Sequence, residues 1–281
     1  MYRVYRTMVQ KNKDESFDMP NNICVFCNNP ILSGNKAPEH IFPRWLQDHL
    51  NLKKIYFYQT LYNQPGTLIE DKRYLSFNGH VSGNVCKKCN TGWLSDIENG
   101  AKEKLILLFD GKEDIKLSLA ESKNLSLWMF KTALTLHSAS IQKRFIPDLH
   151  YKSFYRNLSI PEDVWIHISP VKTSDAQDLS WIQKGGWRGV NSKVQNQDFL
   201  NMIKMCYKVS LRVGWLAWRI AYLPNVNFFD FDNDTVKNIY PRNYELIWKP
   251  SLHLDSLKEL DSSLILSVNR QQVNPSSMFP N

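Results

Sequence analysis

Three short strings decide the fold that this sequence predicts: Cys24-Val25-Phe26-Cys27, then Glu39-His40-Ile41-Phe42-Pro43, then Cys86-Lys87-Lys88-Cys89-Asn90. The two Cys-x-x-Cys pairs supply four thiolates, which is the ligand set of a closed tetrahedral zinc site. One zinc ion bound to both pairs would bring the acid–His pair and the following Asn into one small unit. The sequence therefore predicts a structural zinc ion held by Cys24, Cys27, Cys86 and Cys89.

The cysteine pairs could instead form disulfides, as they would in an exported protein. The segment from Met1 to Arg6, however, contains no apolar run of the kind that a secretory signal requires. In a reducing cytosol a repeated Cys-x-x-Cys motif is typical of metal binding, so we expect zinc and a cytoplasmic location. The fifth cysteine, Cys206, stands in an apolar run and is expected to be a small buried core residue.

Composition favours a folded protein that can bind a polyanion. Of 281 residues, 43% are hydrophobic and 12% aromatic, and the formal net charge is +8. Residues 1–160 hold 22 Lys and Arg against 15 Asp and Glu, a net of +7, whereas residues 161–281 hold 13 against 12. A basic half attracts nucleic acid through the release of counterions.

The most apolar run, Leu211 to Leu223, is interrupted by two arginines and is too short to cross a bilayer, so we expect no membrane span and a core strand or helix there.

Hydrophobic periodicity predicts an α+β fold in two parts. Helical spacing begins at Thr91, ends at Gly111, and returns from Ser122 to Ala139. After Pro161 the pattern changes to strand alternation, most clearly over Tyr207 to Val213. We therefore predict a zinc-stapled domain with a helical extension over residues 1–160. A mixed, strand-rich domain over residues 161–281 follows, with a role in sensing, targeting or partner binding.

The acid–His pair suits the hydrolysis of a phosphodiester. On a strand its two side chains point to opposite faces, so the carboxylate can face a metal ion while the imidazole faces a water molecule. A neutral imidazole, with an ordinary pKa of about 6.5, can accept a proton from that water near pH 7. The order of the motifs resembles the HNH (His-Me finger, ββα-metal) nucleases, in the form with two zinc-binding Cys pairs. The resemblance covers about residues 22–108.

This resemblance implies a ββα-metal unit and a metal-dependent endonuclease that hydrolyses phosphodiester bonds of DNA, with double-stranded DNA as its partner. It implies that Glu39 is a ligand of the catalytic metal, that His40 is the general base and that Asn90 is a second ligand. Both ligands are oxygen donors, which favours Mg²⁺ or Mn²⁺ at the catalytic centre. The four thiolates would then be purely structural.

The sequence departs from the family pattern at two positions. Family members usually carry a middle Asn nine residues before the ligand that follows the second Cys pair, and this position is Val81 here. Asn78, His80 or Asn84 could take its place from nearby. A second ligand four residues after the first, present in some members, is Leu94 here and cannot bind a metal.

A looser likeness is to bacterial HNH-type proteins in which Cys-Asn-x-Gly-Trp precedes an acidic helix and then a Leu-x-x-Trp-x-x-Lys helix. Residues 89–93 and the stretch Leu125 to Lys131 fit this pattern. The likeness implies an accessory or defence nuclease, acting in phage defence or restriction. Glu98 lies eight residues after Asn90, about 80° round the helix, and can reach the site as an extra acidic group or face solvent. Trp93 is expected to pack on the knuckle or the core.

Each site residue also has a purely structural interpretation. His40 could be a satisfied core histidine, Glu39 a surface carboxylate, and Asn90 only the N-cap of the helix that follows. The alternative function is a non-catalytic, zinc-stapled protein that binds nucleic acid or regulates. A third is an interaction protein whose Cys pairs merely hold a small domain together. The half after residue 160 could also mediate homo-oligomer formation or bind a partner protein.

Overall fold

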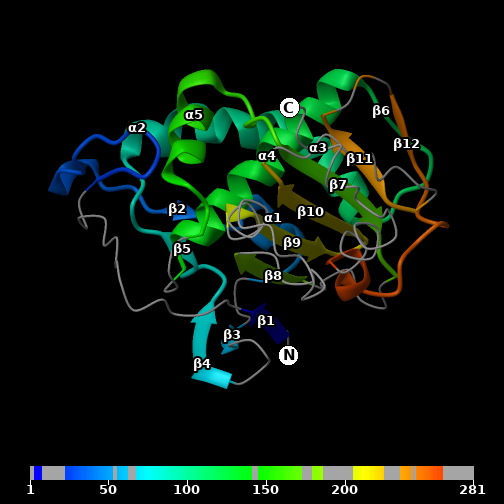
Figure 1. The fold of residues 1–281 in the computed structure, drawn as a ribbon, viewed down its shortest axis with the longest axis horizontal. Helices are drawn as coiled ribbons and strands as arrows, with labels where there is room; N and C mark the ends of the chain where they lie inside the picture. The colour runs from blue at the N-terminus through cyan, green and yellow to red at the C-terminus, as the bar shows by residue number, and fades with distance from the viewer. Residues whose placement is uncertain are drawn as a thin grey trace, which may run out of the picture.

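The described residues form both helices and strands, and the largest sheet is antiparallel, which agrees with the α+β class (Figure 1). The computed structural model describes residues 3–7, 23–52, 56–62, 68–140, 145–172, 179–185, 205–224, 235–241, 243 and 245–261. The helical elements are η1 (Ser33–Asn35), α1 (Arg44–His49), α2 (Lys87–Cys89), η2 (Asn90–Leu94), α3 (Ser95–Phe109), α4 (Leu119–Ser138) and α5 (Asp148–Asn157). The strands are β1 (Arg3–Thr7), β2 (Glu39–His40), β3 (Tyr56–Tyr62), β4 (Leu68–Ser76), β5 (Val81–Ser82), β6 (Ile115–Leu117), β7 (Val164–Pro170), β8 (Leu179–Gly185), β9 (Tyr207–Val213), β10 (Leu216–Tyr222), β11 (Lys237–Tyr240) and β12 (Leu246–Trp248).

A five-stranded antiparallel sheet in the order β11-β7-β10-β9-β8 is the largest sheet among the described residues. β9 has the bounds that its alternating sequence predicts. The apolar run from Leu211 to Leu223 is a hairpin of β9 and β10, rather than one strand or helix. Gly214 makes the turn with a φ of 54°, a conformation that side chains disfavour.

Helix α4 packs against this sheet and carries much of the core (Figure 1). It begins three residues earlier than the periodicity predicts, because Ser118 and Glu121 form a capping box. The Ser118 backbone N–H donates to the Glu121 carboxylate at 2.9 Å, and the Glu121 N–H donates to the Ser118 hydroxyl at 3.3 Å. On the buried face, the ring of Trp128 lies 5.6 Å from that of Trp218 on β10. The helix therefore links the N-terminal motifs to the sheet.

The buried core is continuous across the predicted boundary near residue 160. One cluster of buried side chains includes the Cys pairs, helices α3 and α4, and strands β7 to β10. β6 pairs with β12, with Ile115 opposite Trp248, so segments from both halves share a small sheet. The division into domains 1–160 and 161–281 stays a prediction.

The opposite face of the large sheet carries buried polar side chains and a second, smaller apolar cluster, and it is tied to the segment 254–261. Asp261, which is 3% exposed, accepts hydrogen bonds from Lys184 at 2.5 Å and from Ser210 at 2.9 Å. The Arg219 guanidinium donates to the backbone carbonyl of Leu260 at 2.6 Å. These contacts fix that segment on strands β8 to β10. No helix in the described ranges is both long and apolar enough to cross a membrane.

Candidate functional site

The four predicted zinc ligands come together in the structure. Their sulfur atoms all lie within 4.8 Å of one another. Cys24 and Cys89 Sγ are 3.9 Å apart, and Cys27 and Cys86 Sγ are 3.7 Å apart. Sulfurs at the corners of a tetrahedron around zinc, with Zn–S bonds of about 2.3 Å, lie about 3.8 Å apart, whereas a disulfide needs about 2.05 Å. The cluster can therefore hold a metal ion such as zinc.

The backbone of the two knuckles brings the cysteines into register. Cys24 N–H donates to Asn29 O at 2.9 Å, and the turn closes with Asn28 in the left-handed region at a φ of 60°. The Val25 N–H donates to Asn84 O at 2.9 Å, which joins the first knuckle to the loop before the second. Phe26 packs edge-on against Trp93, with ring centroids 5.2 Å apart. Trp93 therefore serves knuckle packing, as expected from its position.

Hydrogen bonding and burial shift the pKa values of three of the four cysteines in different directions. The hydrogen bond with Cys89 is the main cause that lowers the pKa of Cys24 to about 4. The same bond raises the pKa of Cys89, and burial raises the pKa of Cys27 to about 11. The thiolate form of Cys24 is therefore favoured in the cluster, while a bound cation would be needed to draw the protons from Cys27 and Cys89 near pH 7.

Strand β2 carries the acid–His pair and pairs antiparallel with β5. Glu39 lies opposite Ser82, and His40 lies opposite Val81. Ser82 in turn hydrogen-bonds Ser138 at the end of α4, with the two hydroxyl oxygens 2.6 Å apart. This pair of short strands is thus anchored to the long helix. Glu39 is buried at 4% exposure, and His40 is only partly buried.

His40 is held by its neighbours in the neutral form. Burial lowers its pKa most, the nearby Arg44 guanidinium lowers it further, and a side-chain hydrogen bond with Asn78 acts to raise it. Among the three residues that could replace the middle Asn, Asn78 contacts the imidazole. His80 is buried and stacks on Trp181, with ring centroids 5.4 Å apart.

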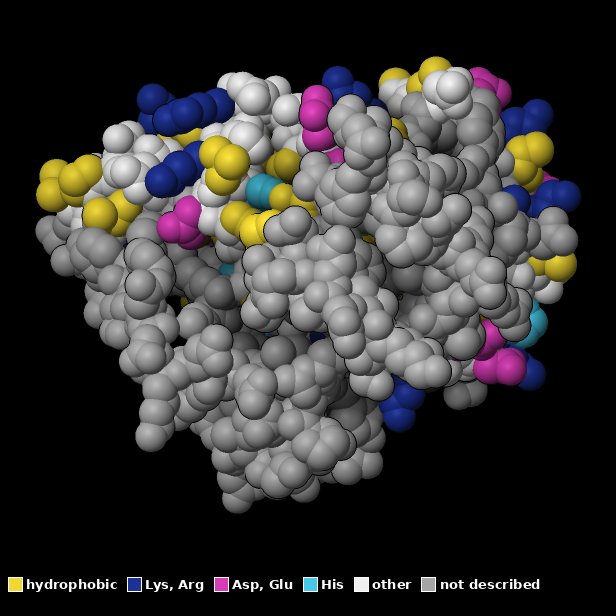
Figure 2. All heavy atoms as spheres, in the orientation of Figure 1, with side chains coloured by type: hydrophobic (Ala, Val, Ile, Leu, Met, Phe, Trp, Pro, Cys, Tyr) yellow, Lys and Arg dark blue, Asp and Glu magenta, His cyan; other side chains and the backbone are white. Residues whose placement is uncertain are grey.

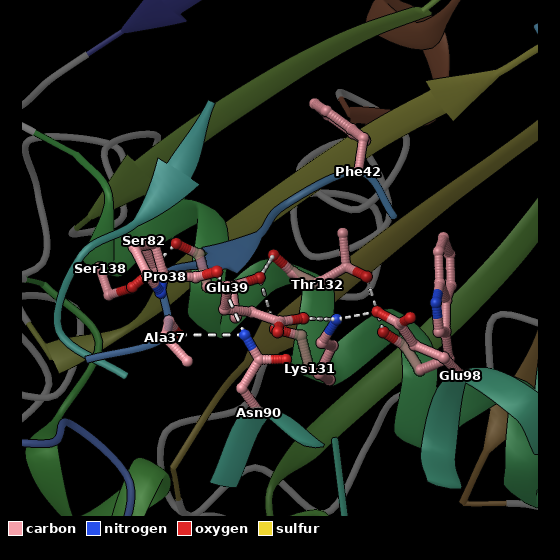
Figure 3. A network of polar contacts seen from close by, with 12 residues as sticks. Ala37, Pro38, Glu39, Phe42, Ser82, Asn90, Glu98, Lys131, Thr132 and Ser138 are labelled. Carbon is pink, nitrogen blue, oxygen red and sulfur yellow. Dashed lines mark hydrogen bonds and ion pairs between the residues drawn. The ribbon is translucent and has the colours of Figure 1, made fainter. Parts of the chain in front are cut away.

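The Asn90 side chain binds the segment that directly precedes the acid–His pair in the sequence. Its Nδ2 donates to the carbonyl oxygen of Ala37 at 3.0 Å and to that of Pro38 at 3.1 Å (Figure 3). Asn90 directly follows α2 and is the first residue of η2, with helical backbone angles, so it is not an N-cap and the capping interpretation is wrong. After it, Gly92 has non-helical angles (φ −100°, ψ −120°) and separates α2 from α3. Because Nδ2 faces the two carbonyls, Oδ1 is left pointing away from them.

The Glu39 carboxylate meets two further charged groups in the interior (Figure 3). It pairs with the ammonium of Lys131 on α4, and the same ammonium lies 2.5 Å from Oε1 of Glu98 on α3. Burial raises the pKa of Glu39, and Lys131 opposes this effect. Burial acts to lower the pKa of Lys131, but Glu39 and Glu98 outweigh it and raise that pKa. Glu39 is therefore not a surface carboxylate, and Glu98 does face the site.

Lys131 is the site residue that sequence reasoning did not assign. It is 0% exposed although lysine is rarely buried without a partner. The sequence signal was a lysine set among the apolar residues of a buried helix, between Phe130 and Thr132. Leu94, by contrast, is a fully buried core residue, as its side chain requires.

Exposed basic side chains lie close in sequence to the site residues. Lys36, Arg44, Lys87 and Lys88 are all exposed. Figure 2 shows Lys and Arg side chains gathered at the upper left, at the end of the molecule where Figure 1 shows α2.

Comparisons of the chain with models of protein families, with curated proteins and with solved structures found no match. We therefore infer its function from its motifs and the geometry of the site.

Proposed function

We propose that this protein is a metal-dependent HNH-type endonuclease that hydrolyses phosphodiester bonds of double-stranded DNA, with a ββα-metal unit held by a structural zinc ion. One observation carries the proposal. Strand β2 buries the Glu39 carboxylate and leaves His40 partly open, while Asn90 from the second knuckle binds the residue directly before them. These are the three residues that the HNH resemblance assigns to metal binding and base catalysis.

His40 is suited to accept a proton from water. Its lowered pKa keeps the imidazole neutral at pH 7, which a general base requires. One imidazole nitrogen is engaged with Asn78, so the other is oriented to take the proton. Asn78 supplies the orienting contact that the family obtains from an Asn at the position of Val81.

Glu39 and Asn90 are suited to hold a divalent cation. A carboxylate oxygen and the Oδ1 of a carboxamide are hard donors, which fit Mg²⁺ or Mn²⁺. Fixing Nδ2 on two backbone carbonyls orients Oδ1 for such a role. When bound, the ion supplies Lewis-acid stabilisation of charge on the phosphate and on the departing 3′ oxygen. Glu98 adds negative charge beside Glu39.

The nucleic acid would lie along the exposed basic residues near His40. Arg44, the first residue of α1, lies close enough to His40 to lower the pKa of its imidazole. Lys87 and Lys88 lie between the two zinc-binding cysteines and can bind phosphates. Most of the excess positive charge lies in residues 1–160, which agrees with this placement. A role in phage defence or restriction is the biological setting that the looser likeness suggests.

Cleavage of supercoiled plasmid by the zinc-loaded protein tests the proposal. We expect nicking and linearisation that depend on added Mg²⁺ or Mn²⁺. His40→Ala should lower the rate about 10²- to 10⁴-fold and leave zinc content and fold unchanged. His49→Ala is the matched control, because His49 binds Asp110 at 2.8 Å outside the site. Normal cleavage by His40→Ala would end the proposal.

The burial of Glu39 in an ion pair favours one alternative, a zinc-stapled DNA-binding or regulatory protein without catalysis. In that case DNA affinity would fall steeply with salt, because Lys and Arg contacts release counterions. No divalent metal would then produce plasmid cleavage. The same two assays therefore separate the two functions.

A further inference from the structure

Lys131 joins three elements that are distant in the sequence. Its ammonium lies between the carboxylates of Glu39 on β2 and Glu98 on α3, and it comes from the middle of α4. Both contacts use the Oε1 atom of the acid. The lysine side chain is 0% exposed, Glu39 is 5% exposed and Glu98 is 19% exposed, so one positive charge sits between two largely buried negative charges.

Such a group acts through its neighbours rather than on a substrate. A fully buried ammonium has no path to a phosphate on the surface. Two carboxylates drawn to one point repel each other strongly, because like charges a few ångströms apart are poorly screened in a protein interior. A cation between them removes this repulsion and fixes the directions of both acids.

Here the inference rests on the proposed function, in which Glu39 is a metal ligand. We propose that Lys131 is a positioning residue of this centre: its ammonium is a resident cation that holds Glu39 and Glu98 together and limits how tightly a divalent ion binds beside it. A divalent ion approaching Glu39 is repelled by Lys131 and attracted by Glu98. Lys131 and Glu98 therefore set the metal affinity of the centre in opposite directions.

The test is a titration of the full-length, zinc-loaded protein with Mn²⁺ alone, with free Mn²⁺ followed by electron paramagnetic resonance. Lys131→Met keeps the length and apolar stem of the side chain and removes its charge. We expect it to bind Mn²⁺ at least about tenfold more tightly than the unchanged protein. Glu98→Gln keeps the shape of the acid and should bind about tenfold more weakly. Zinc content and thermal melting show whether each variant has folded.

Glu39→Gln separates this inference from the function on which it rests. If Mn²⁺ affinity is the same in Glu39→Gln, the ligand assignment is wrong and both proposals fall. In a second outcome, Glu39→Gln abolishes binding, but Lys131→Met and Glu98→Gln both leave it unchanged or both weaken it. Lys131 then forms only structural ion pairs with Glu39 and Glu98, and this inference alone is overturned. If Lys131→Met does not retain zinc, Glu98→Gln decides: weaker binding supports the inference, and unchanged binding overturns it.

Discussion

The carboxamide nitrogen of Asn90 donates to the carbonyl oxygen of Pro38, 3.1 Å away, directly before Glu39 in the chain. The two residues are 52 positions apart in the sequence. The bond joins the end of the second Cys pair to the start of β2. Closing the cysteine cluster therefore also places the acid–His pair, because Asn90, which directly follows α2, is hydrogen-bonded to the segment that carries the pair.

Replacing Asn90 with Ala should disturb both stability and the site. The variant leaves the carbonyls of Ala37 and Pro38 without their donor, which costs about 1–3 kcal/mol in the free energy of unfolding. Cleavage should fall further than this loss explains, since the proposed metal ligand, Asn90 Oδ1, is removed as well. Urea unfolding and plasmid cleavage measure the two effects. Thr91→Ala is the control: its hydroxyl donates only to Lys87 O, within the same helical segment.

Loss of one zinc ligand should unfold the knuckles. Cys27→Ser replaces a thiolate with a poorer ligand, and we expect loss of bound zinc and a fall of at least about 3 kcal/mol in the free energy of unfolding. Zinc is measured by mass spectrometry and stability by urea unfolding. Cys206→Ala is the control, because Cys206 is a buried cysteine outside the cluster. Full zinc content in Cys27→Ser would contradict the assignment.

Asn78 should influence the lowest pH at which the protein cleaves DNA, through its effect on the pKa of His40. In the proposed mechanism cleavage requires neutral His40, so the rate should rise with pH through the pKa of this group, which lies below its ordinary value of about 6.5. The hydrogen bond with Asn78 raises that pKa. Asn78→Ala removes this effect, so the pH of half-maximal rate should move downward, while poorer orientation lowers the plateau about tenfold. Asn84→Ala should leave the profile in place.

The chain should lose stability in acid because of a buried histidine. Burial lowers the pKa of His150 to about 4, and its Nδ1 lies 2.8 Å from the Tyr207 hydroxyl. Below pH 6.5 the unfolded chain takes up a proton at this position that the folded chain takes up only near pH 4. At pH 5 this difference costs about 2 kcal/mol of stability. Urea unfolding at pH 7 and pH 5 should show a drop that is about 2 kcal/mol smaller in His150→Gln.

Lys88 should contribute to DNA binding through its charge. If it binds one phosphate, Lys88→Ala weakens DNA affinity for every sequence and lowers the slope of log affinity against log salt by about 0.9. Fluorescence anisotropy with a short duplex at several salt concentrations measures this. Lys249→Ala is the control, since Lys249 is also exposed but follows β12. Equal slopes in the two variants would remove Lys88 from the interface.

Local sequence patterns predicted the helices, the strands and the cysteine cluster better than they predicted which residues surround the site. The spacing of the cysteines indicated the cluster, and alternation indicated β9 with its observed bounds. Alternation cannot show whether an apolar run contains a turn, so the hairpin of β9 and β10 was missed. Periodicity also placed the start of α4 too late, because a capping box depends on Ser118 and Glu121 rather than on apolar spacing.

The sequence by itself determined which residues carry chemistry: four cysteines at metal-binding spacing, an acid–His pair, and an Asn after the second cysteine pair. Only the tertiary structure decided what surrounds them. Packing of α3 and α4 brings Glu98 and Lys131 to Glu39, and the turn between β4 and β5 brings Asn78 to His40. The physical reason is the distance in sequence over which each feature is determined. The spacing of ligands within a knuckle is local, whereas a buried charge pairs with groups on whichever elements pack beside it in the core.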